Sequence, residues 1–284
     1  MKDELGDRMK SFYEDRTRAS LPRRTFTVIR IDGKAFHTYT RGLVRPFDTG
    51  LIEDMDATTK YLCENIQGVR LGYVQSDEIS LILTDFEKQT TDAWFDGNIQ
   101  KMASISASMA TAKFNELRLL RFAKEIQEKG TSNVKKTFAL FDSRVFTIPH
   151  EEEVLNYLIW RQQDATRNSI SSVAQSMYSP KELHGKTTDN MQEMIFQKGQ
   201  NWNDFPIGQK RGRVILKSFT LVDSTKEKYD LSKNKEGWVV RGDDDTDRID
   251  AYQITRKVWT PVDPPIFTQE KEYLRSQIIT RKEV

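Results

Sequence analysis

Apolar and polar positions in the first part of the chain predict a strand followed by a helix. The compact run Phe26–Ile31 is rich in β-branched and aromatic residues, and the pair Asp32-Gly33 is expected to end that strand. Apolar residues then recur at helical spacing over 51–66, which predicts a helix with one buried face. Thr49 is the expected N-cap of this helix.

The next segments predict a hairpin and a second, longer helix. Residues 69–84 form two apolar arms around the polar turn 75–78. Apolar positions at helical spacing over 94–114 predict a long helix that begins at an Asp92 cap and continues through Leu117. The first half of the chain therefore reads as strand, helix, hairpin and helix.

Shorter signals follow in the second half. Two short strands are expected at 138–141 and 145–148, and a helix over about 151–177 is expected to end before the Ser-Pro pair that follows it. Two further β-rich runs lie at 213–222 and 238–241.

This order of elements predicts an α+β fold in which helices flank an antiparallel sheet. It matches the split βαβ plan of polymerase and cyclase palm domains, a plan that hosts many functions. We expect a palm-like catalytic core over 1–150 and a helical and β C-terminal part over 151–284 packed on it, or one continuous domain.

Composition narrows the class of protein. The chain has 284 residues, with 44 Lys+Arg against 42 Asp+Glu, so any nucleic-acid contact must come from local clustering of charge. One cysteine (Cys63) and three histidines are too few for a zinc site, and Cys63 is expected to be a buried apolar residue. A charged N-terminus and the lack of a long apolar run favour a cytoplasmic enzyme without a membrane segment.

Two acidic segments are the main candidates for chemistry. Asp32 ends a predicted strand, and Asp77 and Glu78 lie in a predicted hairpin turn. Carboxylates at such neighbouring positions can converge on Mg²⁺, whose remaining ligands are supplied by water and substrate phosphates. Two ions would stabilise both the attacking and the leaving oxygen in phosphoryl transfer. The alternative is that both segments are ordinary solvated turns.

Four co-linear motifs resemble those of tRNA-His guanylyltransferases, over about residues 8–220. The family patterns are R-L/I-D-G-x-x-F-H, Q-S-D-E, D-G/S-R and W-R-Q-x-D. The corresponding segments here are Arg30–His37, Gln75–Glu78, Asp142–Arg144 and Trp160–Asp164.

The resemblance implies a palm-like core that adds nucleotides in the 3′–5′ direction. It implies that Asp32, Asp77 and the carbonyl of Gly33 bind two Mg²⁺ ions, with Glu78 in a supporting catalytic role. It places Arg30, Lys101 and Arg144 on nucleotide phosphates, and Lys34, His37 and Ser76 near the nucleotide.

Two segments depart from the family pattern. The family segment K-P-N-D around the 5′-activation site reads Arg45-Pro46-Phe47-Asp48 here, and Arg45 and Asp48 are its candidate nucleotide-binding residues. The eukaryotic enzymes continue W-R-Q-x-D with C-H-I-N-N-L-Y-N, whereas this chain has Thr166 at the histidine position and retains only Asn168. The chain therefore resembles the "like" branch of the family, which is associated with repair of 5′-truncated tRNAs.

The implied function is template-dependent addition of nucleotides to the 5′ end of tRNA. The implied substrates are tRNA, ATP, GTP and other nucleoside triphosphates, and the implied assembly is a homotetramer. Three alternatives remain open at this stage: guanylylation of tRNA-His as the main role, a palm-type nucleotide cyclase, and a non-catalytic tRNA-binding protein. RNA contacts could come from basic or aromatic residues, of which the candidates are Arg16, Arg18, Arg23, Arg24, Lys198, Lys210, Arg211, Arg213 and Trp202.

Overall fold

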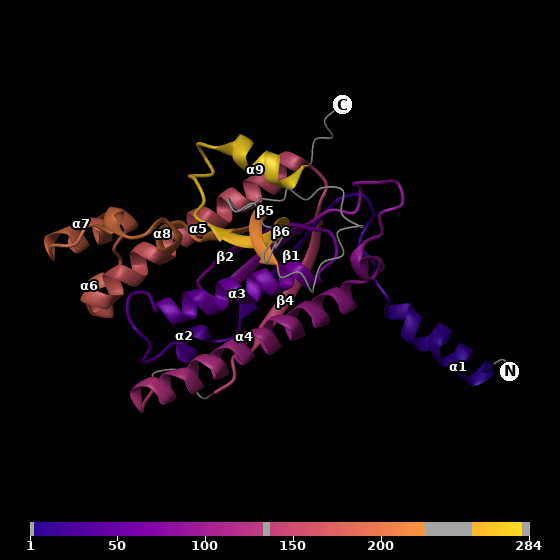
Figure 1. Cartoon of the computed structure of the whole chain (residues 1–284), viewed down its shortest axis with the longest axis horizontal. Coiled ribbons are helices and arrows are strands. Elements are labelled where there is room, and N and C mark those ends of the chain that lie inside the picture. The colour runs from indigo at the N-terminus through magenta and orange to yellow at the C-terminus, as the bar shows by residue number, and fades with distance from the viewer. Residues whose placement is uncertain (1–2, 133–136, 225–251, 280–284) are drawn as a thin grey trace, which may run out of the picture.

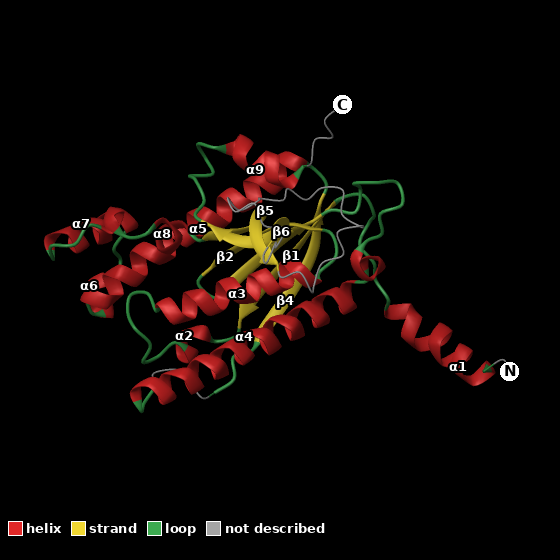
Figure 2. Ribbon diagram, in the orientation of Figure 1, coloured by secondary structure: helices red, strands yellow, loops and turns green. Residues whose placement is uncertain are grey.

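A six-stranded antiparallel sheet forms the centre of the molecule, with helices on both of its faces (Figures 1 and 2). The computed structural model describes residues 3–132, 137–224 and 252–279. The strand order is β4-β1-β3-β2-β5-β6. The strands are β1 Phe26–Gly33, β2 Val69–Gln75, β3 Glu78–Leu83, β4 Phe141–Ile148, β5 Arg213–Ser224 and β6 Tyr252–Val262.

The helices differ greatly in length, and three long ones cover the sheet. These are α3 Thr49–Asn65, α4 Ile99–Lys129 and α5 Glu151–Met177. The shorter helices are α1 Glu4–Met9, α2 Phe36–Tyr39, α6 Pro180–Leu183, α7 Thr188–Gln197, α8 Ile207–Arg211 and α9 Lys271–Ile278. Among the described residues, no helix combines the length and apolarity needed to cross a membrane.

Alternation along β1 gives each face of the sheet its own core. Ile29 and Ile31 pack with α3 and α4, whereas Phe26 and Val28 pack with α5 and α9. A third apolar cluster joins α5 to α6 and α7, and it includes Trp202. Because Arg30 and Asp32 alternate in step with Val28, they belong to the α5 face of the sheet.

The predicted fold class is confirmed, and several predicted boundaries are wrong. β1 does not stop before Asp32 but continues through Gly33, because Asp32 pairs with strands on both sides. The hairpin turn is shorter than 75–78, because Gln75 and Glu78 pair with each other and leave only Ser76 and Asp77 in the turn.

Two helix caps and one strand also differ from prediction. Asp48, not Thr49, caps α3, and Asn98, not Asp92, caps α4, because these side chains accept hydrogen bonds from backbone N–H groups of the first turn. The two short strands at 138–141 and 145–148 are instead the single strand β4, which pairs along its whole length with β1.

The second half of the chain contributes strands to the same sheet. The predicted helix over 151–177 is confirmed as α5. The β-rich run at 213–222 is confirmed within β5, which pairs with β2 on one side and β6 on the other. The β-rich run at 238–241 lies outside the described residues.

Candidate active site

Acidic and polar residues form a row across four strands at one end of the sheet. In the strand register Asp32 lies opposite Asp142 of β4 on one side and Glu78 of β3 on the other, and Glu78 lies opposite Gln75 of β2. Asp32 is partly exposed, whereas Gln75 and Glu78 are buried. The end of β1 therefore carries its carboxylate at the centre of a polar edge.

The hairpin tip is tied directly to the end of β1. The backbone N–H of Gly33 donates to the carbonyl of Asp77 over 3.1 Å. Ser76 has a positive φ of 49°, a conformation that non-glycine residues adopt rarely and mostly in tight turns or functional sites. This linkage places the Asp77 segment beside the Asp32 segment, although the two are far apart in the sequence.

Asp32 and Asp77 form a carboxylate pair with little positive compensation. Burial raises the pKa of Asp77 to about 6, and the negative charges of Asp32 and Glu78 act in the same direction. The described residues give Asp77 no ion-pair partner, and the guanidinium of Arg30 is 3.9 Å from Asp32. A cation would relieve the repulsion between the two carboxylates.

The available donors fit magnesium better than a metal held wholly by protein. Asp32, Asp77 and the Gly33 carbonyl are hard oxygen donors. In the part of the chain that the structure describes, no group of three or more His, Cys, Asp and Glu side chains could hold a metal ion. Two carboxylates whose metal is completed by substrate phosphates match the usual coordination of Mg²⁺.

Glu78 is held by two arginines instead of facing the carboxylate pair. Its Oε2 accepts from Arg30 over 2.5 Å, and Arg161 donates to Oε1 and Oε2 over 3.0 and 2.8 Å. Glu78 and Arg161 are 5% and 2% exposed. Both oxygens are therefore already engaged by arginine, and this favours a supporting role for Glu78 over metal binding.

The other basic candidates lie at different distances from this row. Arg144 faces Arg30 in the β1–β4 register and is exposed, with Asp142 3.8 Å away. Lys34 is exposed just after β1. Lys101 is exposed in the first turn of α4, which packs on the opposite face of the sheet from Arg30. The structure thus brings Arg144 beside Arg30 but leaves Lys101 on the other side.

A first cavity of about 340 Å³ opens over the acidic row. Its wall combines the end of β1, the hairpin tip and one face of α5. The lining residues are Arg30, Asp32, Gln75, Ser76, Asp77, Glu78, Asp164, Asn168, Ser171, Ser172 and Gln175.

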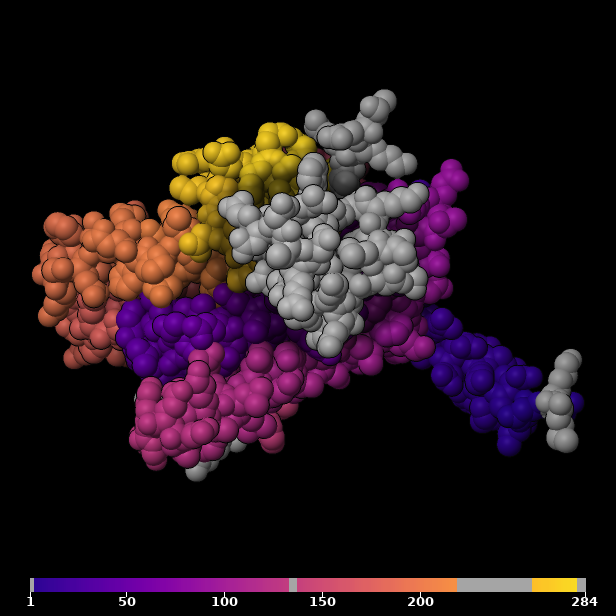
Figure 3. Space-filling model, viewed as in Figure 1, coloured from indigo at the N-terminus to yellow at the C-terminus, as the bar shows by residue number. Residues whose placement is uncertain are grey.

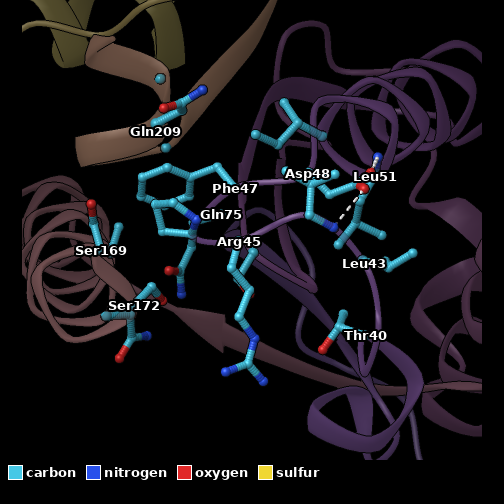
Figure 4. A pocket seen from close by; sticks show the side chains of 18 of the residues that line it. Thr40, Leu43, Arg45, Phe47, Asp48, Leu51, Gln75, Ser169, Ser172 and Gln209 are labelled. Carbon is cyan, nitrogen blue, oxygen red and sulfur yellow. Dashed lines mark hydrogen bonds between the residues drawn. The ribbon is translucent and has the colours of Figure 1, made fainter. Parts of the chain in front are cut away.

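A second cavity of about 340 Å³ adjoins the first. His37 of α2 and the segment 43–48 form one side of it, and α5 forms another. In Figure 4, Arg45 extends into the space between Thr40 and Ser172. The two cavities share a polar wall, which consists of Gln75, Ser76, Asn168, Ser172 and Gln175.

The residues beside Arg45 stabilise the local fold. Asp48 accepts from the backbone N–H of Leu51 over 2.7 Å and from that of Val44 over 3.2 Å. It therefore caps α3 and closes the loop that carries Arg45. Phe47, at the family's asparagine position, packs against Phe205 with ring centroids 5.5 Å apart.

Several candidates for RNA contact form hydrogen bonds inside the protein instead. Trp202 is buried, and its Nε1 donates to the Ser169 hydroxyl over 3.0 Å. Lys210 donates to the carbonyl of Asn203, and Arg213 donates to Asp56 over 2.7 Å. Burial and internal partners explain all three without RNA.

Other sequence expectations can be compared with the packing. Cys63 is buried, as expected for an apolar role, and burial raises the pKa of its thiol. The packing around Gly33 leaves no room for a side chain. A Cβ there would lie 2.2 Å from the ring of Phe36, which belongs to the core under the site.

Sequence reasoning missed the roles of Arg161 and of the polar face of α5. In the sequence Arg161 is part of the W-R-Q-x-D motif, and the signal for its role is an arginine on an otherwise apolar helix face. Ser172 and Gln175 carried no motif. They became visible only because α5 turns that face toward both cavities.

Comparison with known proteins gives consistent results. The family model described as tRNAHis guanylyltransferase matches residues 6–149. A solved bacterial tRNA(His) guanylyltransferase-like protein in complex with ATP has a TM-score of 0.76 and 40% sequence identity to this chain, covering 97% of this chain and 99% of its own.

Two further relatives extend this similarity. The bacterial guanylyltransferase-like protein in complex with GTP gives a TM-score of 0.71 and 39% identity, again over 97% of this chain and 99% of its own. A probable tRNA(His) guanylyltransferase of Drosophila melanogaster is 27% identical over 228 residues, which cover 75% of this chain and 73% of its own.

Proposed function

Because the chain belongs to the tRNA-His guanylyltransferase family of nucleotidyltransferases, we propose that it adds nucleotides to the 5′ end of tRNA in the 3′–5′ direction. The substrate we favour is a tRNA that lacks its first 5′ nucleotides, and the opposite strand of the acceptor stem acts as template. ATP and GTP, which the related bacterial protein binds, are the expected nucleotides.

The pair of adjoining cavities is the observation that carries this proposal. One cavity contains Asp32 and Asp77, and the other contains Arg45 and His37. A reaction with two successive stages at one RNA end requires two nucleotide positions within reach of each other. A shared polar wall satisfies that requirement.

The first stage activates the RNA end. An oxygen of the tRNA 5′-monophosphate attacks the α-phosphorus of ATP, a new P–O bond forms, and pyrophosphate leaves. We assign the ATP of this stage to the cavity beside Arg45, whose guanidinium can pair with phosphate oxygens. Asp48 holds the Arg45 loop through its hydrogen bonds to Val44 and Leu51.

The second stage adds the nucleotide. The 3′-hydroxyl of the incoming nucleoside triphosphate attacks the activated 5′-phosphorus, and AMP leaves. Arg30 lines the cavity over Asp32 and Asp77, and Arg144 lies on the neighbouring strand, so both can bind the triphosphate. Positive groups placed before the reaction stabilise the charge that develops on phosphoryl oxygens.

Asp32, Asp77 and the Gly33 carbonyl would hold two Mg²⁺ ions. When bound, Mg²⁺ neutralises phosphate charge and favours the deprotonated attacking oxygen. The protein's own part is to keep these oxygen donors together, which the hydrogen bond from Gly33 to Asp77 achieves.

We also propose the homotetramer that the family resemblance implies. The first helix and the turns after it project from the body of the molecule (Figures 1 and 3). Leu5, Met9, Phe12 and Tyr13 are 60%, 41%, 56% and 66% exposed. An apolar face of this kind is commonly covered in an assembly. Analytical ultracentrifugation would decide the state, and a monomer at micromolar concentration would reject it.

A primer-extension assay on the RNA 5′ end tests the function. The substrate is a tRNA without its first nucleotide and with a 5′-monophosphate, incubated with Mg²⁺, ATP and all four nucleotides. Extension by the templated base is expected for the wild type and should be lost in Asp32→Ala and Asp77→Ala. Asp189→Ala, an exposed carboxylate on α7 outside both cavities, is the matched control.

The outcomes separate the alternatives. Absence of both extension and an adenylylated RNA end across several tRNAs would reject the proposal. RNA-independent formation of a cyclic nucleotide would identify a cyclase, and RNA binding without nucleotide turnover would identify a binding protein. Extension of full-length tRNA-His alone would make guanylylation the main role.

A further inference from the structure

Arg30 is the one lysine or arginine among the described residues that line the cavity over the acidic row. Four carboxylates line the same cavity, from Asp32, Asp77, Glu78 and Asp164. A triphosphate that enters there meets mostly negative charge. The orientation and free donors of Arg30 therefore matter for nucleotide binding.

Few N–H groups of Arg30 donate hydrogen bonds to other protein groups. Its Nη2 donates to Glu78 over 2.5 Å and is 3.9 Å from Asp32. Its Nε is buried and has no hydrogen-bond partner within the described part of the chain, and among those residues Nη1 makes no hydrogen bond either. Its side chain is 20% exposed. Glu78 thus fixes one end of the guanidinium, and Nη1 is the terminal nitrogen that is left to meet a ligand.

Arg161 is what keeps Glu78 in place. Arg161 comes from α5, and its Nη1 donates to both Glu78 oxygens over 3.0 and 2.8 Å. Its guanidinium lies 3.4 Å from the centre of the Trp160 ring, and Asp164 is 3.5 Å from it. Stacking and two carboxylates leave this buried side chain little freedom.

Removing Arg161 would alter Glu78 in a predictable way. A buried carboxylate needs positive partners, and Arg30 would be the remaining one. Arg30 would then turn further toward Glu78 and offer fewer N–H groups to a phosphate. The ion pair of Arg161 therefore affects the substrate through Arg30, without touching the substrate itself.

We propose that Arg161 is a positioning residue for the incoming nucleotide: by holding both oxygens of Glu78, it fixes the carboxylate that orients Arg30 toward the triphosphate. This inference rests on the proposed function, because it assigns a triphosphate to the cavity over Asp32 and Asp77. It adds to that function a buried residue that contacts neither nucleotide nor metal.

The test compares the same substitution at two arginines of α5. Arg161→Met removes the contacts to Glu78, whereas Arg167→Met removes only an exposed pair with Asp164. The measurements are the affinity for ATP and GTP with Mg²⁺ by titration calorimetry, and KM and kcat in the extension assay. For Arg161→Met we expect affinity to fall about 10- to 100-fold, as for loss of a charge-assisted contact. Arg167→Met should match the wild type.

A double-mutant cycle separates positioning from a structural role. If Arg161 acts through Arg30, Arg30→Met and the double variant Arg30→Met/Arg161→Met should bind nucleotide equally weakly. Additive losses would overturn the proposal, as would equal affinities of Arg161→Met and Arg167→Met. KM should rise more than kcat falls, since Arg30 contacts the triphosphate before the chemical step.

A milder variant covers the case in which Arg161→Met does not fold. Arg161→Lys keeps the charge but has no planar guanidinium that could stack on Trp160 while it donates to Glu78. Its affinity should fall in the same direction, and the loss should again vanish in the Arg30→Met background. A wild-type protein that neither binds nor uses nucleotides would refute the proposed function itself, a result distinct from either failure above.

Discussion

Two buried carboxylates in this molecule are each held by two arginines, on opposite faces of the sheet. Asp54 of α3 is 3% exposed and accepts from Arg118 over 2.9 Å and from Arg121 over 2.8 to 3.2 Å. Glu78 of β3 is held in the same way by an arginine from β1 and one from α5. The local chemistry of the two clusters is nearly the same.

Their surroundings differ. The Asp54 cluster joins α3 to α4, and Arg121 continues to the exposed Glu53. The Glu78 cluster lies at the end of a hairpin, and its Arg30 lines the cavity that contains Asp32 and Asp77, whereas Arg118 and Arg121 line a different cavity. We therefore expect the position of a buried ion cluster in the fold, and not its composition, to decide whether the cluster affects nucleotide binding.

The largest expected effect is on stability, from Asp54→Ala. Two guanidiniums, one of them 2% exposed, would lose their shared carboxylate. The free energy of unfolding should fall by about 3–5 kcal/mol, the usual result of breaking a buried pair. Chemical denaturation measures this change. Nucleotide affinity of the folded fraction should be unchanged. A specific loss of affinity would show that the Asp54 cluster, like the proposed Glu78 cluster, affects nucleotide binding.

Glu78→Gln should show the opposite balance. Glutamine keeps the shape and one acceptor oxygen, so the free energy of unfolding should fall by only about 1–3 kcal/mol. KM for the incoming nucleotide should rise, because Arg30 loses its charged partner. Steady-state extension kinetics measure KM. A variant with normal KM would show that the Glu78 cluster is as purely structural as the Asp54 cluster.

Gly33→Ala tests how the site depends on the core beneath it. A Cβ would overlap the Phe36 ring, which packs against Phe114 and Phe141 with centroids 5.7 and 5.2 Å apart. Overpacking of this kind should cost about 1–3 kcal/mol of stability. Thermal unfolding measures the cost, and trimming Phe36 to Leu in the same chain should recover part of it. An unchanged melting temperature would contradict this reading of Gly33.

Asp48→Ala should have the smallest effect on stability. Loss of the α3 cap should lower the free energy of unfolding by about 1 kcal/mol. Because Asp48 also holds Val44, the Arg45 loop should loosen and RNA adenylylation should fall more than addition to a pre-activated RNA end. Measuring the two stages separately checks this, with Thr49→Ala as the neighbouring control. Equal losses in both stages would contradict the assignment of the activating ATP to the cavity beside Arg45.

Periodicity and motif together predicted a large part of the structure from the sequence. The strand before Asp32, the hairpin and α5 follow from local apolar patterns, which determine an element wherever one face is buried. The sequence indicates Asp32 and Asp77 as candidate metal ligands because Asp32 ends a predicted strand and Asp77 lies in a predicted hairpin turn. The sequence indicated only that these two carboxylates could converge, and the pairing of β1 with β3 is what brings them together.

The tertiary structure decided the rest. No local pattern shows that Arg161, far along the chain, reaches Glu78, or that the polar face of α5 forms a wall common to two cavities. The observed helix caps and strand ends also differ from the predicted ones by a residue or more, because side-chain hydrogen bonds and cross-strand partners determine them. Local sequence determines which face of an element is apolar, whereas the partner of a buried charge is determined only by how the elements pack.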